Sequence, residues 1–281
     1  MLARTTEVLL EDEIRNRRDA GVAFAVATIV RTVASTSAKP GAKALIEADG
    51  AIAHGFLGGG CVRSAVGRAA RDAIANGQPQ FLSLRPEDLL DAEGVAAGDE
   101  RDGILYARNG CPSEGSLDIF VEPVLPLPHL LICGSGAVAA ALIDLSRRFD
   151  LRLSHCTRAA LPPDFPHVDT QITHFDEDPI WQSVDFCVVA TQGQGDQAAL
   201  HRALISGCGE VSFLGSRRKF TKLAAKLRAQ GIPDNDIARV KAPAGLDIHA
   251  ITPEEIALSI LAQIVMTRRA RDRGEKGAAA S

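Results

Sequence analysis

The chain has 281 residues and a formal net charge of −4 at pH 7, with 46% hydrophobic and 23% charged residues, the balance of a globular protein with one large domain or two smaller ones. The negative charge and an aromatic content of 4% argue against nucleic acid or an anionic membrane as a partner. Because acidic residues stand where a signal peptide needs an apolar stretch, and no apolar run reaches the about 18 residues of a membrane span, we expect a cytoplasmic protein without such a span.

The first 125 residues have the patterns of a small α+β domain. Apolar, β-branched residues over 22–33 predict a buried strand, and Asp49-Gly50 between two short apolar runs predicts a hairpin. Residues 86–110 are polar and acidic with scattered glycines, which indicates a loop with one helical turn. The expected elements are helices over 2–20 and over 62–76, the second closed by Gly77, and strands over 22–33, 42–47, 51–54, 79–84 and 116–123.

The pattern changes after the proline-rich connection Leu125-Pro-Leu-Pro-His129, which marks a domain boundary. Strands and helices then alternate, as in a parallel, doubly wound sheet. We therefore expect an α/β chain: a smaller N-terminal α+β domain over 1–125, a Rossmann-type parallel sheet with helices on both faces over 129–271, and a disordered tail over 272–281. The expected strands span 129–133, 151–155, 171–175, 186–191 and 210–214, and the expected helices span 134–149, 196–206, 220–230 and 252–271.

The motif Gly134-x-Gly136-x-x-Ala139 lies between an expected strand and an expected helix, which is the context of a dinucleotide fingerprint. Its glycines permit a tight turn and let a pyrophosphate approach the helix N-terminus. The acidic residue that usually holds the ribose after the second strand is missing, and Arg158 stands in that stretch. Two interpretations stay open: these residues bind a dinucleotide such as NAD(P) or FAD, with Arg158 facing a phosphate, or the glycines only let the helix and the strand pack closely.

Three glycines, Gly58, Gly59 and Gly60, precede Cys61 at the expected start of a helix. A helix N-terminus favours the thiolate, which is the form of cysteine that attacks electrophiles and binds soft metals. Cys111 lies in a second turn, just before a strand. If the two loops are neighbours, the two thiols form a site for copper, molybdenum or transferable sulfur, or they pair as a disulfide; otherwise they are two unrelated thiols.

The remaining clusters differ in what they predict. Cys133, Cys187 and Cys208 lie within or beside expected strands and helices, so we expect them in the core, and the scattered histidines lack the spacing of a zinc site. The segment Leu214-Gly-Ser216-Arg217-Arg218 follows a strand, where it can form an anion site. The segment Thr252-Pro-Glu-Glu255 has the residues of a helix start, which explains its carboxylates without catalysis.

Several motifs in a fixed order resemble the XdhC/CoxI family, the accessory factors of xanthine dehydrogenase and related molybdenum hydroxylases. The resemblance runs over nearly the whole chain, and no single motif would suffice for it. Its N-terminal part rests on Ala27-Thr-Ile-Val-Arg-Thr, Pro40-Gly-Ala-Lys and Gly58-Gly-Gly-Cys-Val. Its C-terminal part rests on His129-Leu-Leu-Ile-Cys-Gly-Ser-Gly, Leu214-Gly-Ser-Arg-Arg and Ala242-Pro-Ala-Gly-Leu-Asp-Ile.

The resemblance implies a cofactor-maturation chaperone more than a metabolic enzyme. Such a factor binds the molybdenum cofactor and assists its sulfuration, copper loading or insertion into an apo-hydroxylase of the xanthine dehydrogenase or carbon monoxide dehydrogenase type. Cys61 maps to the cysteine of the family's glycine loop, and the Cys111 motif resembles the carbon monoxide dehydrogenase branch. The chain departs from the family at Cys156, Ala244 and His249, where members commonly carry Asp, Ile and Gly, and these departures argue against ordinary nicotinamide binding.

Two alternatives to maturation stay open. One is a dinucleotide-dependent oxidoreductase that acts in thiol redox chemistry, and the other is a scaffold whose Rossmann domain only docks a partner enzyme. The expected partners are an apo molybdenum hydroxylase and other maturation factors. A homodimer is the default expectation, because two-fold dimers are the commonest closed assembly.

Overall fold

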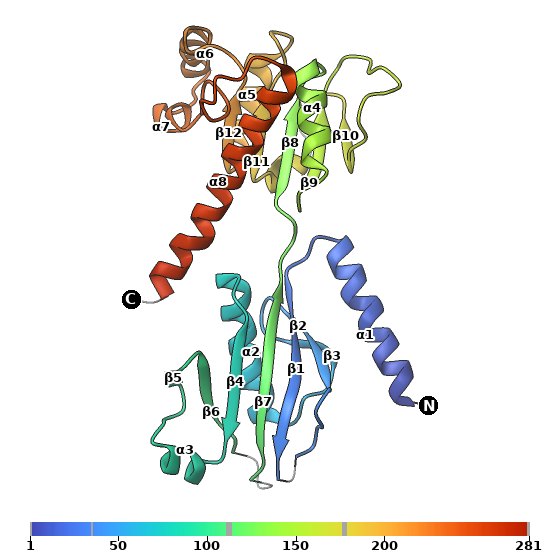
Figure 1. Ribbon diagram of the computed structural model, residues 1–281, viewed down its shortest axis with the longest axis vertical. Coiled ribbons are helices and arrows are strands. Elements are labelled where there is room, and N and C mark those ends of the chain that lie inside the picture. Colours follow the sequence, from blue (N-terminus) through green and yellow to red (C-terminus); the bar gives the residue numbers. More distant parts are fainter. Residues whose placement is uncertain (1, 35, 111–113, 176–178, 280–281) are drawn as a thin grey trace. The chain divides into compact units, whose positions relative to one another are not determined.

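The computed structural model describes residues 2–34, 36–110, 114–175 and 179–279 (Figure 1). The chain divides between Pro126 and Leu127 into two compact units, and each unit is built around a sheet of its own. Among the described residues, no helix combines the length and the apolar character that crossing a membrane requires.

Unit 1, the part up to Pro126, contains a seven-stranded sheet in the order β3-β2-β1-β7-β4-β6-β5. Alternate residues of its central strand β1, Ala25, Ala27 and Ile29, are buried in one core with residues of helix α2, as expected for a strand with one covered face. The elements are α1 (Leu2–Asp19), β1 (Phe24–Val33), β2 (Lys43–Glu47), β3 (Ile52–Gly55), α2 (Gly60–Asn76), β4 (Gln80–Arg85), α3 (Glu87–Glu93), β5 (Glu100–Arg101), β6 (Ile104–Arg108) and β7 (Ser116–Val124).

Local signals in unit 1 gave two correct predictions and one wrong one. Strands β2 and β3 form the hairpin around Asp49-Gly50, and Gly77 ends α2 in the left-handed conformation, at φ 63°. The prediction of a loop with one helical turn over 86–110 is wrong, because this stretch forms α3, β5 and β6. Acidic residues in its first turn and a left-handed Gly94 at its end support α3, while β6 gains its hydrogen bonds from β4, with which it pairs in parallel.

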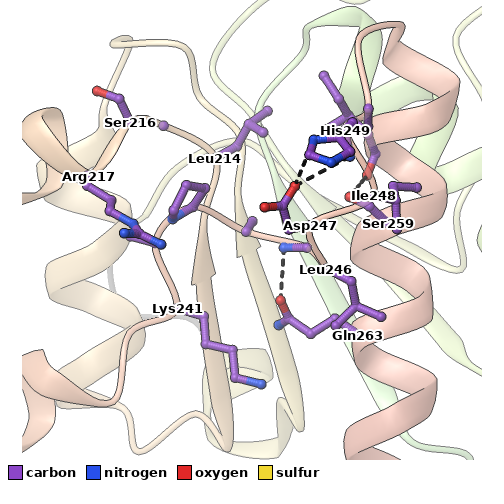
Figure 2. Close-up of a pocket in the computed structure, with 17 residues that line it drawn as sticks. Leu214, Ser216, Arg217, Lys241, Leu246, Asp247, Ile248, His249, Ser259 and Gln263 are labelled. Carbon is purple, nitrogen blue, oxygen red and sulfur yellow. Dashed lines mark hydrogen bonds and ion pairs between the residues drawn. The ribbon is translucent and has the colours of Figure 1, made fainter.

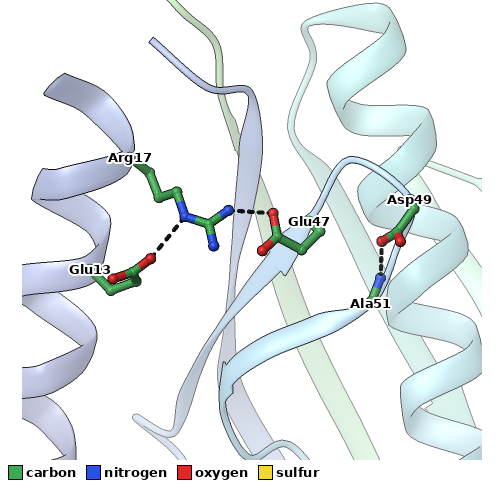
Figure 3. Close-up of polar contacts among 5 residues, drawn as sticks. All are labelled: Glu13, Arg17, Glu47, Asp49 and Ala51. Carbon is green, nitrogen blue, oxygen red and sulfur yellow. Dashed lines mark hydrogen bonds and ion pairs between the residues drawn. The ribbon is translucent and has the colours of Figure 1, made fainter. Parts of the chain in front are cut away.

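Helix α1 is fixed to unit 1 by an apolar and a polar contact. Leu10 is buried with Phe24 and Leu45 in a small core of its own. Arg17 donates through Nε to Glu13 at 2.8 Å and through Nη1 to Glu47 on β2 (Figure 3). The hydrogen bonds from Arg17 hold the pKa of the Glu13 carboxyl below its usual value, so the pair stays charged at neutral pH.

Unit 2, from Leu127 onward, contains a five-stranded sheet in the order β10-β9-β8-β11-β12, and every strand pair in it is parallel. The expected Rossmann-type sheet is therefore confirmed. Its elements are β8 (His129–Cys133), α4 (Ala137–Ser146), β9 (Arg152–Cys156), β10 (Thr170–Ile172), a 3-10 turn (Pro179–Ser183), β11 (Phe186–Val189), α5 (Asp196–Ile205), β12 (Glu210–Phe213), α6 (Arg217–Ala229), α7 (Asp234–Ala238) and α8 (Pro253–Ala279).

Helices cover both faces of this sheet, and each face has its own core. Leu130 and Ile132 of β8 are buried with residues of α4 and α8, whereas Leu131 and Cys133 of the same strand are buried with residues of α5 and α6. Helix α8 continues to Ala279 and so takes in most of the residues expected as a disordered tail. Alanine, arginine, lysine and glutamate, the strong helix formers of that stretch, account for the extension.

Four cysteines of unit 2 are buried free thiols: Cys133, Cys156, Cys187 and Cys208. Hydrogen bonds with the neighbouring thiols of Cys156 and Cys187, together with burial, raise the pKa of Cys133. Burial raises the pKa of Cys208 to about 12. The predicted core positions of Cys133, Cys187 and Cys208 are confirmed, and such thiols are poor nucleophiles at neutral pH.

Candidate functional site

Cys61 is exposed at the start of helix α2 in unit 1. The backbone at Gly58, just before the helix, has a left-handed φ of 137°. Gly59 is the N-cap residue and has no side chain that could form a hydrogen bond with the first turn of the helix. The first backbone N–H groups of a helix have no partner within the helix. The thiol of Cys61 therefore stands in the first turn of a helix whose end no capping side chain covers.

Two further loops meet the glycine-rich loop at this end of the sheet. A Cβ placed on Gly110 would lie 3.3 Å from the Sγ of Cys61, so the backbone of Gly110 is adjacent to the thiol. A Cβ placed on Gly58 would lie 3.5 Å from the Oγ of Ser37. The loops that contain Ser37, Cys61 and Gly110 thus converge, although they are far apart in the sequence.

Cys111 lies outside the described residues, so its position relative to Cys61 stays a prediction. It follows Gly110 directly in the sequence. Within the described part of the chain, no group of three or more His, Cys, Asp or Glu residues is arranged to hold a metal ion. A copper or molybdenum site at Cys61 and Cys111 therefore also stays a prediction.

A buried carboxylate lies at the start of β7, on the sheet face opposite the α2 core. Asp118 is 5% exposed and accepts hydrogen bonds from Ser83 Oγ at 2.7 Å and from Arg31 Nε at 2.6 Å. Arg85 lies 3.7 Å from the same carboxylate. Sequence reasoning missed this group, because its members come from three strands and only their register brings them together.

The carboxyl ends of β8, β9 and β11 enclose a crevice in unit 2. The strand order reverses between β8 and β11, which makes this the usual ligand position of an open α/β sheet. The crevice has a volume of about 250 Å³, less than the roughly 300–1,000 Å³ of common ligand pockets. Its lining consists of Gly134, Ser135, Thr157, Arg158, Ala159, Phe175, Thr191, Gln194, Gly195 and Ala198.

The two glycines of the dinucleotide fingerprint lie against other residues of unit 2. A Cβ on Gly134 would lie closer than 3.0 Å to the backbone of Ala190, and one on Gly136 would lie 2.6 Å from the side-chain nitrogen of Gln192. Ala139, a residue of α4, is 1% exposed in the core that this helix forms with the sheet. Close packing is therefore a sufficient reason for small residues at Gly134 and Ala139, whereas Gly136 meets only the amide of the exposed Gln192 side chain.

Electrostatic contacts fix the loop that closes the crevice. Asp196, at the start of α5, accepts hydrogen bonds from Thr191 and from the backbone of Gly193, and it pairs with Lys219 of α6. Burial alone would raise the pKa of Asp196, but these contacts outweigh it and lower the pKa. Arg158 lies over the ring of Phe175, 5.8 Å from its centroid, and both residues line the crevice; that Arg158 faces a phosphate stays a prediction.

A larger pocket lies outside the carboxyl end of β12, with a volume of about 720 Å³. Ser216 and Arg217 border it where α6 begins, and Ser216 caps that helix by accepting a hydrogen bond from the backbone of Lys219. Figure 2 shows Arg217 and Lys241 on one side of the loop over residues 242–250, and Ser259 and Gln263 of α8 on the other. Two segments noted in the sequence, 214–218 and 242–249, thus form one pocket.

Buried hydrogen bonds hold the wall of this pocket, which we call the β12 pocket. Gln263 is 2% exposed; its oxygen accepts from the backbone of Gly245 at 2.8 Å, and its nitrogen donates to Ser212 and Glu210. Lys241 pairs with the same Glu210 at 3.1 Å. Gln263 was missed in the sequence, although a polar residue among the apolar positions of a helix is a signal that could have identified it.

The loop of the β12 pocket carries an exposed acid and an exposed imidazole. Asp247 lies 3.6 Å from the Nδ1 of His249, and His249 has a left-handed φ of 57°. That conformation favours glycine. The histidine, where the family commonly carries glycine, therefore occupies a backbone position that suits glycine better.

The sequence matches two family models. Residues 17–85, which include Cys61, match the XdhC and CoxI family, and residues 130–264, which include the crevice and the β12 pocket, match the XdhC Rossmann domain. The chain belongs to the XdhC/CoxI family. Both groups of predicted site residues in this family member therefore lie within the matched segments, except for Cys111.

Relatives of this XdhC/CoxI chain are found in bacteria. YqeB, an uncharacterized protein of Escherichia coli, is 29% identical over 87% of the chain and 43% of its own length. A Bacillus subtilis protein, named as a probable component of xanthine dehydrogenase, is 29% identical over 54% of the chain and 46% of its own length. The chain thus covers less than half of either relative. A solved structure of a xanthine dehydrogenase from Bacillus halodurans has 20% identity and a TM-score of 0.44, over 92% of this chain and 96% of that chain.

Proposed function

We propose that this XdhC/CoxI-family protein is an accessory factor in the maturation of a molybdenum hydroxylase and that Cys61 handles the sulfur given to the hydroxylase cofactor. The family supports the general role, and the name of the Bacillus subtilis relative points to xanthine dehydrogenase as the kind of enzyme served. One observation carries the assignment to Cys61: among the described cysteines it is the exposed one, at a helix start where three loops converge.

Two cysteines suit the electron balance of such a step. Cys61 first takes a sulfane sulfur from a persulfide donor, which returns to its thiol form. The thiolate of Cys111 then attacks the inner sulfur of the Cys61 persulfide, forming a disulfide and releasing hydrosulfide, which would replace an oxo ligand of the cargo cofactor with loss of water. A thiol reductant finally reduces the disulfide, so the cofactor is cargo and the cycle leaves the protein unchanged.

The test is co-expression of the chain with its apo-hydroxylase, followed by assay of cyanide-labile sulfur and molybdenum in the purified hydroxylase. We expect Cys61→Ser and Cys111→Ser to give a hydroxylase that contains molybdenum but lacks labile sulfur. Ser64→Ala, one turn further along the exposed side of α2, is the matched control and should behave like the unchanged chain. A fully sulfurated hydroxylase from Cys61→Ser would disprove the role of that thiol.

Copper loading and cofactor insertion are alternatives within the same role. Copper transfer predicts about one copper per chain after anaerobic purification, lost in Cys61→Ser. Insertion alone predicts a hydroxylase without molybdenum when Cys61 is replaced. The dinucleotide-dependent oxidoreductase has less support, because packing against Ala190 explains Gly134 and the crevice beside the glycine turn is small.

A further inference from the structure

We propose that unit 2 binds a phosphate-bearing ligand in the β12 pocket, at Arg217, and not over the turn formed by Gly134 and Gly136. The two places are both at carboxyl ends of the parallel strands, where open α/β sheets bind ligands. The two places differ in whether a side chain of the protein already occupies the space for a ligand. The inference stands on unit 2 alone and does not depend on the role of Cys61.

The exposed side chain of Gln192 lies over the glycine turn. In dinucleotide-binding domains, the second glycine of the fingerprint lets the pyrophosphate come close to the backbone. Here the amide of Gln192 lies over that glycine, because a Cβ on Gly136 would meet three atoms of the amide within 3.0 Å. The adjoining crevice holds about 250 Å³, which is small for a dinucleotide.

Arg217 gives the β12 pocket an available positive charge. Within the described part of the chain, its guanidinium has no hydrogen-bond or ion-pair partner, whereas Lys241 is paired with Glu210. Arg217 is the first residue of α6, next to the N-cap residue Ser216, which accepts from the backbone of Lys219, so its guanidinium starts from the positive end of the helix dipole. A planar guanidinium beside backbone donors matches the oxygens of a phosphate.

The pocket is large enough for more than an inorganic ion and is fixed in shape. Its 720 Å³ falls within the range of small-molecule sites. The hydrogen bond from Gly245 to Gln263 ties the loop to α8, so little ordering is needed when a ligand enters. Asp247 lines the same pocket and can accept a hydrogen bond from a hydroxyl or N–H of the ligand. The class of ligand is therefore a phosphate ester whose other end carries hydrogen-bond donors.

Isothermal titration of the full-length chain with inorganic pyrophosphate and with ADP tests the proposal. We expect both to bind and Arg217→Ala to weaken both by at least about tenfold. Arg218→Ala removes the same charge from the next position of α6 but not from the pocket lining, so it should change either affinity less than about twofold. Because Arg217 is exposed, its variant should keep the melting temperature of the unchanged chain.

Arg158→Ala, which alters the glycine crevice, separates the two positions. The proposal expects it to leave both affinities unchanged. Loss of binding in Arg158→Ala with normal binding in Arg217→Ala would return the ligand to the crevice and overturn the proposal. It would also be overturned if neither probe bound to the unchanged chain at millimolar concentration, or if Arg218→Ala weakened binding as much as Arg217→Ala, since the effect would then come from charge alone.

Discussion

The backbone of Gly110 lies against the Sγ of Cys61: a Cβ added to Gly110 would be 3.3 Å from that sulfur. Two segments separated by 49 positions thus share one exposed corner of unit 1. The sulfur remains accessible because residue 110 has no side chain. Substitutions at position 110 should therefore control access to Cys61 without touching the cysteine.

Gly110→Val should slow the alkylation of Cys61 by iodoacetamide several-fold, because its methyl groups would cover the sulfur. Peptide mass spectrometry of the native protein over time measures the rate at this one cysteine. Gly59→Val is the matched control, since a Cβ at that position of the same corner meets no atom within 4 Å. Equal slowing in both variants would mean that the valine disturbs the loop in general and that Gly110 does not control access.

Gly245→Ala should destabilise unit 2 by about 2 kcal/mol or more. Gly245 has a φ of 93°, and an added Cβ would come closer than 3.0 Å to the Oγ of Ser259. Gly207→Ala isolates the backbone part of this cost, because its φ is 71° and its Cβ meets open space; it should lose about 1 kcal/mol.

Urea unfolding followed by fluorescence measures both variants specifically. The chain has one tryptophan, Trp181, which is fully buried in unit 2. Adding Ser259→Ala to Gly245→Ala should restore about 1 kcal/mol through coupling of the two sites. An additive double variant would show that the two side chains do not compete for space.

Unit 2 should lose stability as the pH falls from 6.5 towards 4. Burial, followed by the neighbouring charge of Arg152, lowers the pKa of His129 from 6.5 to about 4. The unfolded chain therefore binds more protons than the folded one between these values, so stability is complete above pH 6.5 and falls through this window. Nδ1 of His129 lies 2.8 Å from Nη2 of Arg152 and 3.1 Å from the carbonyl oxygen of Ser183, and Nε2 lies 2.8 Å from the hydroxyl of Ser154.

The test is the urea midpoint of the Trp181 fluorescence signal, measured from pH 7 to pH 5. Ordinary carboxylates titrate below this range, so they contribute little to the change. His129→Gln should flatten the dependence without abolishing it, because burial also lowers the pKa of His155. An unchanged slope in His129→Gln would assign the pH dependence to other groups.

His249→Gly should stabilise unit 2 relative to His249→Ala by about 1 kcal/mol. The φ of 57° at His249 is left-handed, a region that costs an alanine more than a glycine, and the side chain is 95% exposed, so its removal leaves no cavity. The difference between the two midpoints isolates the backbone from the loss of the imidazole. Equal midpoints would mean that the loop relaxes to another conformation when the histidine is removed.

Patterns within a few neighbouring residues were enough to predict much of the fold. Glu255 donates its backbone N–H to Thr252 and accepts from the N–H groups of Ile251 and Thr252, which confirms the structural explanation given for this carboxylate. The same held for the hairpin at Asp49-Gly50 and for the alternation of strands and helices in unit 2. For Glu255 and for the hairpin the stabilising partners lie close in sequence, whereas in unit 2 the alternation was visible although the paired strands are distant.

Features that depend on distant partners could not be predicted. Strand β6 is a short apolar run, Ile-Leu-Tyr-Ala-Arg, within a stretch that is otherwise acidic and glycine-containing, and it takes its hydrogen bonds from the distant β4. Gln192 has a left-handed φ of 52° and its amide lies over Gly136, and nothing in the local sequence requires either feature. Likewise, only the folded sheet shows that the loops of Cys61 and Gly110 meet.

The reactivity of the buried thiols of unit 2 can report how often this unit opens. Cys133, Cys156, Cys187 and Cys208 are each 1% exposed or less, so a reagent reaches them only in molecules whose Rossmann sheet has come apart. Cys61 reacts in the folded chain and records the dose of reagent in the same tube. The ratio of the two signals after a short pulse therefore gives the frequency at which unit 2 opens, without denaturant and without any added label.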